Sequence, residues 1–453
     1  MRWSYIRLAF IGGGGRSFNL LPNFTATKLS ECADLQDRRE CLATLTLGTS
    51  FIAAGAASAK DSKAGTKDVP ITVTLPLEPS SGGTFCVRLT VFASDEGDNN
   101  SPEDSFRVYK SIVDTGSPYL VLPSSGSGND EQIFPWMTKR AFAAPEDSPL
   151  LLSSSEYTPT DEIYGAVKGQ INWKSARYMF RDPRLQILSK IKTAAGVVGV
   201  LDDALTNEAT GGGMIEPYAL LGLIRNSNPD ADRNRFPDPR PSFIEQEILT
   251  DQDNYSDDTS NEEYRINSFS IDGPNRKLTL STQSLIRTTI PAMRLVDLRK
   301  YGDFVDHYAV VVDSVSFNEV SITSGSLQKV SGSKVERPIV AVFDTGLTGC
   351  LLIRPFWDVL MKYMGDKSDD AGGGYRSVSL YAKGDEKQKQ NNGSSICKIN
   401  SSMEEDKRFY VQPIDLDWFD DEKISPFVIV LGQTFLRQGL LTIDINQRLA
   451  TFR

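Results

Sequence analysis

Two stretches of the sequence share one plan: SIVDTGSPYLVLP at residues 111–123 and AVFDTGLTGCLLI at residues 341–353. In each stretch, apolar residues lead into Asp-Thr-Gly, and a second apolar run follows a few residues later. Each copy also has a later element in which two apolar residues precede a glycine, ALLGL around Gly222 and VIVLGQ around Gly432. This twofold repetition of an Asp-bearing turn predicts two similar lobes, each of which delivers one carboxylate.

Strand signals dominate the chain from about residue 69 onward. Runs such as VPITVTLPL, TFCVRLTVFA and YAVVVDSVSF are rich in β-branched and aromatic residues, and glycine, serine and proline separate them. Helical periodicity is restricted to short pieces, of which RPFWDVLMKYMG, beginning at Arg354, is one. Acidic stretches rich in glycine and asparagine interrupt the strands and predict solvated loops. The sequence therefore predicts an all-β fold with long insertions.

Length, charge and histidine content exclude several function classes. The 453 residues exceed one ordinary small core, which favours two lobes or domains. The net charge of −10 argues against nucleic acid or an anionic membrane as the main partner, because either would need a basic face. The only histidine, His307, lies at the head of an apolar run that predicts a strand, where we expect a structural or surface role. Zinc sites built on several histidines are excluded, so hydrolytic chemistry here should use carboxylates and no metal.

The five cysteines leave one question open. Their number is odd and the chain contains no Cys-x-x-Cys motif, so no zinc or thioredoxin-like motif is present. Cys350 and Cys397 could form one disulfide in an oxidising compartment. The alternative is that both are buried free thiols.

The repeated stretches, taken with two others, resemble the pepsin-like aspartic proteases. The motifs are DTGS and DTGL in apolar frames, each followed later by two apolar residues and glycine. The closing stretch VIVLGQTFLRQGLLTIDINQRLATF looks like the C-terminal segment of that family. The segment PYALLGLIRNSNP, followed by PSFIEQEIL, is similar to the end of the family's first lobe. The resemblance spans roughly residues 69–453.

This resemblance implies a bilobal fold with two pseudo-symmetric β-rich lobes around an active-site cleft. The N-terminal lobe would span residues 69–265 and carry Asp114, and the C-terminal lobe would span residues 266–453 and carry Asp344. Two carboxylates held close together share one proton, because like charges repel at short range. The ionised partner takes a proton from water while the protonated partner donates to the peptide carbonyl oxygen. The implied function is an endopeptidase that acts on peptides or proteins, without cofactor and as a monomer.

Five further residues match supporting positions of the family. Gly116 and Gly346 allow a tight turn with close backbone approach, and their amides can bond the carboxylates. Thr115 and Thr345 match the family threonines that form hydrogen bonds across the two loops. Ser117 matches the residue whose hydroxyl supports the first aspartate.

Several positions depart from the family pattern. Leu347 stands where a threonine or serine usually supports the second aspartate, so we expect the pKa of the pair to be raised and the activity to favour milder acidity. Val121 replaces the tryptophan that steadies the flap hairpin, and Trp173 is a candidate substitute. Tyr164 is the candidate flap tyrosine; the alternative is an ordinary surface hairpin. The rival function is a catalytically inactive relative that binds peptides.

The N-terminal stretch has the features of a targeting peptide. Arg38 and Arg39 precede an apolar, small-residue run that ends in Ala-Ser-Ala at residues 57–59. This arrangement resembles the bipartite peptides of thylakoid-lumen proteins, so residues 1–59 are expected to be removed there. The alternatives are the secretory pathway, with a vacuolar or extracellular destination, a chance apolar stretch, or a membrane anchor. We expect the mature chain to make no stable membrane contact.

Overall fold

The computed structural model confirms the all-β class. It describes residues 71–80, 83–92, 106–123, 152–164, 167–180, 196–201, 218–225, 240–246, 265–287, 290–301, 303, 305–318, 320–331, 337–364, 374–375, 377–383, 396–402, 409–414 and 426–453. The expected targeting peptide at residues 1–59 lies outside these residues and stays a prediction. In the described part of the chain, no helix is long and apolar enough to cross a membrane.

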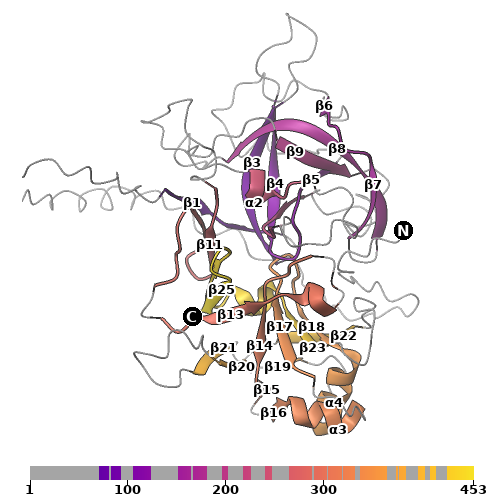
Figure 1. Ribbon diagram of the computed structural model, residues 1–453, viewed down its shortest axis with the longest axis vertical. Coiled ribbons are helices and arrows are strands. Elements are labelled where there is room, and N and C mark those ends of the chain that lie inside the picture. Colours follow the sequence, from indigo (N-terminus) through magenta and orange to yellow (C-terminus); the bar gives the residue numbers. More distant parts are fainter. Residues whose placement is uncertain are drawn as a thin grey trace, which may run out of the picture. The chain divides into compact units, whose positions relative to one another are not determined.

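One sheet has nine described strands and carries the first Asp-Thr-Gly stretch (Figure 1). Its strands, in spatial order, are β2 (Glu78–Pro79), β3 (Phe85–Phe92), β4 (Phe106–Asp114), β10 (Ala219–Gly222), β5 (Leu120–Pro123), β9 (Gly196–Leu201), β8 (Val167–Phe180) and β6 (Ser153–Ser154). The ninth, β7 (Thr160–Tyr164), pairs with β8 as a hairpin. Asp114 is the last residue of β4.

A second sheet has twelve described strands and carries the other Asp-Thr-Gly stretch. Its order is β1 (Thr72–Pro76), β12 (Lys277–Ser281), β11 (Ser268–Asp272), β24 (Leu440–Asp444), β25 (Leu449–Phe452), β13 (Met293–Val296), β14 (Ala309–Val312), β17 (Ile339–Phe343), β23 (Phe427–Leu431), β18 (Cys350–Ile353), β22 (Phe409–Ile414) and β19 (Gly374–Tyr375). The first strand, β1, pairs with β12, so residues 72–76 join a sheet built otherwise from residues beyond 265.

A smaller sheet and five short helices complete the described structure. The sheet is formed by β16 (Val320–Thr323), β15 (Ser314–Phe317), β20 (Ser377–Lys383) and β21 (Ile396–Ser402). The helices are α2 (Phe243–Gln246), η3 (Leu298–Tyr301), α3 (Ser324–Ser331), α4 (Arg354–Met364) and α6 (Gln433–Leu436). Their brevity agrees with the limited helical periodicity of the sequence.

The apolar patterns explain which strands lie inside. In β12, the buried Leu278 and Leu280 alternate with the exposed Lys277 and the half-buried Thr279, because successive side chains of a strand point to opposite faces. Every residue of β17 and of β23 is buried, and these two strands pair in parallel at the centre of the sheet. Continuous apolar runs of this kind are typical of strands covered on both faces.

The same five-strand arrangement occurs in both large sheets. In the first, β10 lies between β4 and β5, parallel to β4 and antiparallel to β5. In the second, β23 lies between β17 and β18 with the same two orientations. On the outer sides, β3 and β14 are antiparallel to β4 and β17, and β9 and β22 are parallel to β5 and β18. The internal repeat of the sequence is therefore matched by a repeat of strand topology.

Candidate active site

Asp114 lies at the end of β4, where β10 pairs with that strand in parallel. Its Cα partner in β10 is Gly222, and its carbonyl oxygen accepts a hydrogen bond from the Leu223 amide at 2.8 Å. Its carboxylate oxygen Oδ1 accepts a bond from the Gly116 amide at 2.7 Å. The side chain is only 1% exposed. The turn Asp-Thr-Gly thus folds back so that its own backbone binds its carboxylate.

Asp344 occupies the equivalent place after β17. Its amide donates to the carbonyl oxygen of Leu431, the last residue of β23, at 3.0 Å. Its Oδ1 accepts two backbone bonds, from Gly346 at 3.0 Å and from Leu347 at 3.2 Å. The side chain is 0% exposed. Both aspartates therefore lie at the end of an interior strand. The neighbouring parallel strand, β10 for Asp114 and β23 for Asp344, leads to a hydrogen bond with the backbone of each aspartate.

Thr115 and Thr345 join the two turns through four reciprocal hydrogen bonds. The Thr115 amide donates to Thr345 Oγ1 at 3.1 Å, and the Thr345 amide donates to Thr115 Oγ1 at 3.0 Å. Each hydroxyl then donates to a carbonyl of the opposite strand, Thr115 to Phe343 at 2.8 Å and Thr345 to Val113 at 2.7 Å. Since all four are buried, this network defines the separation of the two turns.

Each glycine of the two turns lies against the carboxylate of the other turn. A β-carbon placed on Gly116 would lie 2.8 Å from Cγ and both carboxylate oxygens of Asp344. A β-carbon placed on Gly346 would lie 2.5 Å from Oδ1 of Asp114. No real side chain fits at such distances, so glycine is required for the two aspartates to approach one another. The structure thus brings together Asp114, Thr115, Gly116, Asp344, Thr345 and Gly346.

The two carboxyl groups have different electrostatic surroundings. Burial raises the pKa of Asp114, while the Gly116 amide and the neighbouring Ser117 act to lower it. Burial also raises the pKa of Asp344, and the adjacent charge of Asp114 raises it further, to well above its usual range. The amides of Leu347 and Gly346 offset only part of this effect. Burial and mutual repulsion therefore favour a state in which one proton is shared by the pair.

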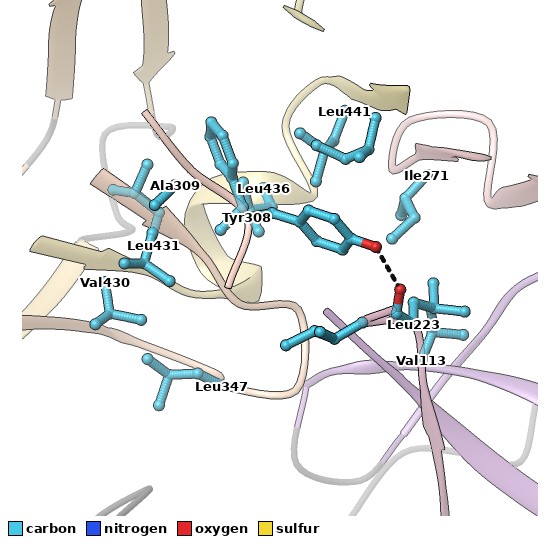
Figure 2. Close-up of a cluster of buried hydrophobic side chains, with 14 of the residues drawn as sticks. Val113, Leu223, Ile271, Tyr308, Ala309, Leu347, Val430, Leu431, Leu436 and Leu441 are labelled. Atoms are coloured by element: carbon cyan, nitrogen blue, oxygen red, sulfur yellow. Dashed lines mark hydrogen bonds between the residues drawn. The ribbon is translucent and has the colours of Figure 1, made fainter. Parts of the chain in front are cut away.

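A chain of three hydrogen bonds also connects Asp114 with the end of β17. Figure 2 shows the middle bond, between the Tyr308 hydroxyl and the Leu223 carbonyl. The Leu223 amide binds the carbonyl of Asp114, and the Tyr308 hydroxyl donates to the carbonyl of Leu223 at 2.6 Å. The carbonyl of Tyr308 accepts a bond from the Phe343 amide at 2.9 Å. Burial raises the pKa of the Tyr308 hydroxyl, which keeps it a donor. Sequence patterns did not reveal this residue, because its partner lies 85 positions away.

Ser117 and Leu347 are the residues that follow the two Asp-Thr-Gly turns. Ser117 lowers the pKa of Asp114, yet among the described residues its buried hydroxyl makes no hydrogen bond of good geometry. Leu347 packs its side chain into the main core, 9% exposed, and only its backbone amide reaches Asp344. The second turn therefore has no hydroxyl at the position where the first turn has one.

Replacement of Leu347 by threonine should move the titration of the pair toward lower pH. An added hydroxyl that donates to the Asp344 carboxylate favours its charged form and so lowers its pKa. A hydrogen bond to a charged group is worth about 1.5–3 kcal/mol, which corresponds to a shift of about one pKa unit or more. The measurement is a pH–rate profile with one peptide substrate, and the basic limb should move to lower pH. Leu347→Val is the matched control, since valine has the shape of threonine without the hydroxyl. Equal profiles for Leu347→Thr and Leu347→Val would contradict the expectation.

The β7–β8 hairpin carries the candidate flap residue. Tyr164 ends β7 and pairs with Val167 across the turn, and the positions of its side chain and of residues 165–166 lie outside the described structure. Val121 and Trp173 belong to one small buried cluster with Tyr119 and Ile171. The Trp173 indole donates to Thr160 Oγ1, in the first residue of β7, at 3.0 Å. Trp173 is therefore packed in the same cluster as Val121 and is bonded to the hairpin.

Of the two alternatives left open for Cys350 and Cys397, a disulfide or buried free thiols, the structure has Cys350 as a free thiol. Cys350 is a buried free thiol in β18 of the twelve-stranded sheet. Cys397 lies on β21 of the four-stranded sheet, where its cross-strand partner is Ala382. Separation along the chain gives no information about which sheet each residue joins, so spacing alone could not decide between the two alternatives.

Cys350 should resist alkylation in the native protein. Burial raises the pKa of its thiol to about 12, so almost none of the reactive thiolate exists at pH 8. We expect iodoacetamide to leave Cys350 unmodified in the folded chain and to modify it fully in guanidinium without reductant, as measured by peptide mass spectrometry. Modification that requires a reductant as well as denaturant would instead indicate a disulfide.

His307 has a structural environment, as expected. It is 1% exposed, and its Nδ1 lies 2.7 Å from Oδ2 of Asp303. Its positive charge, when present, lowers the pKa of Asp114. Within the described ranges, no group of three or more histidine, cysteine, aspartate or glutamate side chains could hold a metal ion.

Chemically, the site is a pair of buried carboxyl groups fixed by backbone amides, and one proton shared between them relieves their repulsion. Such a pair can accept one proton and donate another in the same step. Comparison with protein-family models and with curated proteins gives no match for this chain.

Proposed function

We propose that this chain is an aspartic endopeptidase with the bilobal pepsin-like fold. The observation that carries the proposal is the reciprocal arrangement of the two Asp-Thr-Gly turns. Each turn supplies one buried carboxylate, one glycine beside the opposite carboxylate, and one threonine that binds the opposite strand. A merely structural turn would not need two carboxylates buried side by side, because bringing like charges together is costly.

The roles follow from the electrostatics of the pair. In this proposal Asp114 is the ionised member and takes a proton from a water molecule as that water attacks the peptide carbonyl. Asp344, which holds its proton, donates it to the carbonyl oxygen, so the tetrahedral intermediate forms without a charged oxyanion. Asp114 then gives the proton that it took from water to the leaving nitrogen, Asp344 takes back the proton of one hydroxyl as the C=O bond re-forms, and the C–N bond breaks, which returns the pair to its starting state. Water is the nucleophile, and this route uses no covalent intermediate on the protein.

In this proposal, peptide substrates lie across the dyad and the β7–β8 hairpin is the flap that contacts them. The hairpin follows the Asp114 turn in the same sheet, and Tyr164 stands at its tip. The two similar five-strand units would form the two lobes, with the dyad where their central turns meet.

The test is a peptidase assay on the purified chain. We expect cleavage of an unfolded protein substrate at acidic pH, blocked by a statine-containing analogue such as pepstatin. Chelators and reagents that modify serine or cysteine should leave the rate unchanged. Binding of the analogue without cleavage would instead indicate the inactive, peptide-binding relative. Neither binding nor cleavage would refute both functions.

A further inference from the structure

A buried arginine, Arg240, is stacked on two aromatic rings beside the Asp114 turn. Its guanidinium carbon lies 4.1 Å from the ring centroid of Trp173 and 4.8 Å from that of Tyr119. The two rings contact each other edge to face, with centroids 5.0 Å apart. Arg240 is 4% exposed, Trp173 is 3% exposed and Tyr119 is 6% exposed. We call these three side chains the arginine stack.

Thr160 connects the arginine stack to the hairpin. Its Oγ1 accepts a hydrogen bond from Arg240 Nη1 at 2.9 Å and another from Trp173 Nε1 at 3.0 Å. Thr160 is the first residue of β7 and pairs with Ile171 of β8, whose side chain is packed in the same cluster. Two donors from different segments therefore meet on one hydroxyl at the base of the hairpin.

The other side of the stack is part of the turn that presents Asp114. Tyr119 lies five positions after the aspartate, and its carbonyl oxygen accepts a bond from the Gly222 amide at 2.9 Å. Gly222 is the cross-strand partner of Asp114. The neighbouring Pro118 carbonyl accepts a bond from Phe243, in the segment that also carries Arg240. Arg240 therefore contacts both the Asp114 turn and the base of the hairpin.

The charge of Arg240 indicates that this side chain does more than occupy space in the core. Burying a cation is costly unless specific partners compensate, and an apolar side chain would fill the same space without that cost. A guanidinium can stack on two rings and donate in its own plane at the same time, which neither lysine nor an apolar residue can do.

We propose that Arg240 is a positioning residue that holds the β7–β8 hairpin in register with the Asp114 turn, so that the hairpin places long peptides against the dyad. The inference rests on the proposed function, because it assigns the hairpin a substrate contact. It adds a residue that neither the motifs nor the family resemblance indicated.

The experiment compares Arg240→Met with Arg240→Lys on two substrates, an eight-residue peptide and a four-residue peptide with the same scissile bond. The long peptide contacts the hairpin and the short one does so much less, so Arg240→Met should lower kcat/KM about tenfold for the long peptide and less than about twofold for the short one. Arg240→Lys keeps a cation over the rings and should recover part of the loss. Equal losses on both peptides, or none, would overturn the proposal.

Arg337→Met is the matched control. Arg337 is also buried, 9% exposed, and stacks over Phe427 with 4.5 Å from its guanidinium carbon to the ring centroid. It lies at the opposite end of β17 and β23 from Asp344. This variant should show a stability loss in thermal unfolding without changing the ratio of kcat/KM between the long and short peptides. A changed ratio in this control would show that the ratio reports stability alone and would overturn the inference.

Hydrogen exchange separates this inference from the proposed function. Backbone amides of residues 160–180 should exchange faster in Arg240→Met than in wild type, and should be unchanged in Arg337→Met. If the wild type cleaves neither peptide, the proposed function fails, and exchange alone then decides whether Arg240 holds the hairpin. Unchanged exchange across these residues in Arg240→Met would overturn the positioning role.

Discussion

Asp344→Asn should lower the rate of peptide hydrolysis by about 10²–10⁴-fold, which is what proton transfer by a positioned group contributes. Asparagine can accept the backbone bonds from Gly346 and Leu347, but it has no carboxyl proton to donate to the peptide carbonyl. The measurement is kcat with a peptide substrate, and Asp114→Asn should show a loss of the same order. Asp444→Asn is the matched control, because Asp444 is 2% exposed and also accepts a backbone bond, from Gln447, away from the dyad. Retention of more than a few per cent of turnover by Asp344→Asn would show that the dyad is misassigned.

The same substitution should stabilise the folded chain at neutral pH. Asp344 has a raised pKa in the folded state, so the folded state binds its proton more tightly than the unfolded state does. The free energy of unfolding therefore falls as pH rises from the unfolded pKa, near 3.9, through the raised folded pKa. Asparagine is neutral at every pH and avoids this loss. Thermal unfolding at pH 7 should show a higher Tm for Asp344→Asn than for wild type, and the difference should vanish below about pH 3. A lower Tm at both pH values would contradict the description of Asp344 as a destabilising buried acid.

Gly346→Ala should reduce kcat by at least about a hundredfold, the loss that a misplacement of about 1 Å can cause. The new methyl group would lie 2.5 Å from Oδ1 of Asp114, and that oxygen is held in place by the Gly116 amide. The clash can be relieved only by moving one carboxylate away from the other, which breaks the proton-sharing pair. Steady-state kinetics on the purified variant measure the loss, and thermal unfolding shows whether the fold is retained.

Gly325→Ala is the control for the glycine prediction. Gly325 lies in α3, and its nearest neighbour would be 3.9 Å from the added methyl group, so nothing has to move. Alanine also has a higher helix propensity than glycine, so stability should be unchanged or slightly improved. Activity equal to wild type in both variants would mean that the carboxylates do not lie against these glycines.

Much of the fold was predictable because its signals are local. Alternation in runs such as residues 277–281 marks strands that face a core on one side, and continuous apolar runs such as residues 339–343 mark central strands. The positions of Asp114 and Asp344 at strand ends were predictable for the same reason, since an apolar run followed by Asp-Thr-Gly is a strand that ends in a turn. The twofold repeat of that pattern allowed the two turns to be considered together before their contacts were known.

The remaining features depend on contacts between distant parts of the chain. The arginine stack and the Thr160 hydroxyl bonded to it draw on four separate segments, and no local pattern links these segments. The Tyr308 bond to Leu223 is equally non-local. Whether Cys350 and Cys397 pair could not be decided from their spacing, because the two residues join different sheets. The assignment of Tyr164 as flap tyrosine and of residues 1–59 as targeting peptide stays a prediction.

The hydrogen bonds between Thr115, Thr345 and the opposite strands also determine at which stage of synthesis the site can form. They join residues 228 to 232 positions apart, and β17 and β18 are completed only by β23, which ends at Leu431. A nascent chain held short of that residue on the ribosome contains both aspartates but has no strand to hold the second one. Pairings at such separations also form slowly, because the chain entropy of the intervening loop is lost before any stabilising contact is made. The two carboxyl groups can therefore be brought together only after Leu431 has been synthesised, and a polypeptide that stops short of that residue contains both aspartates without an assembled pair.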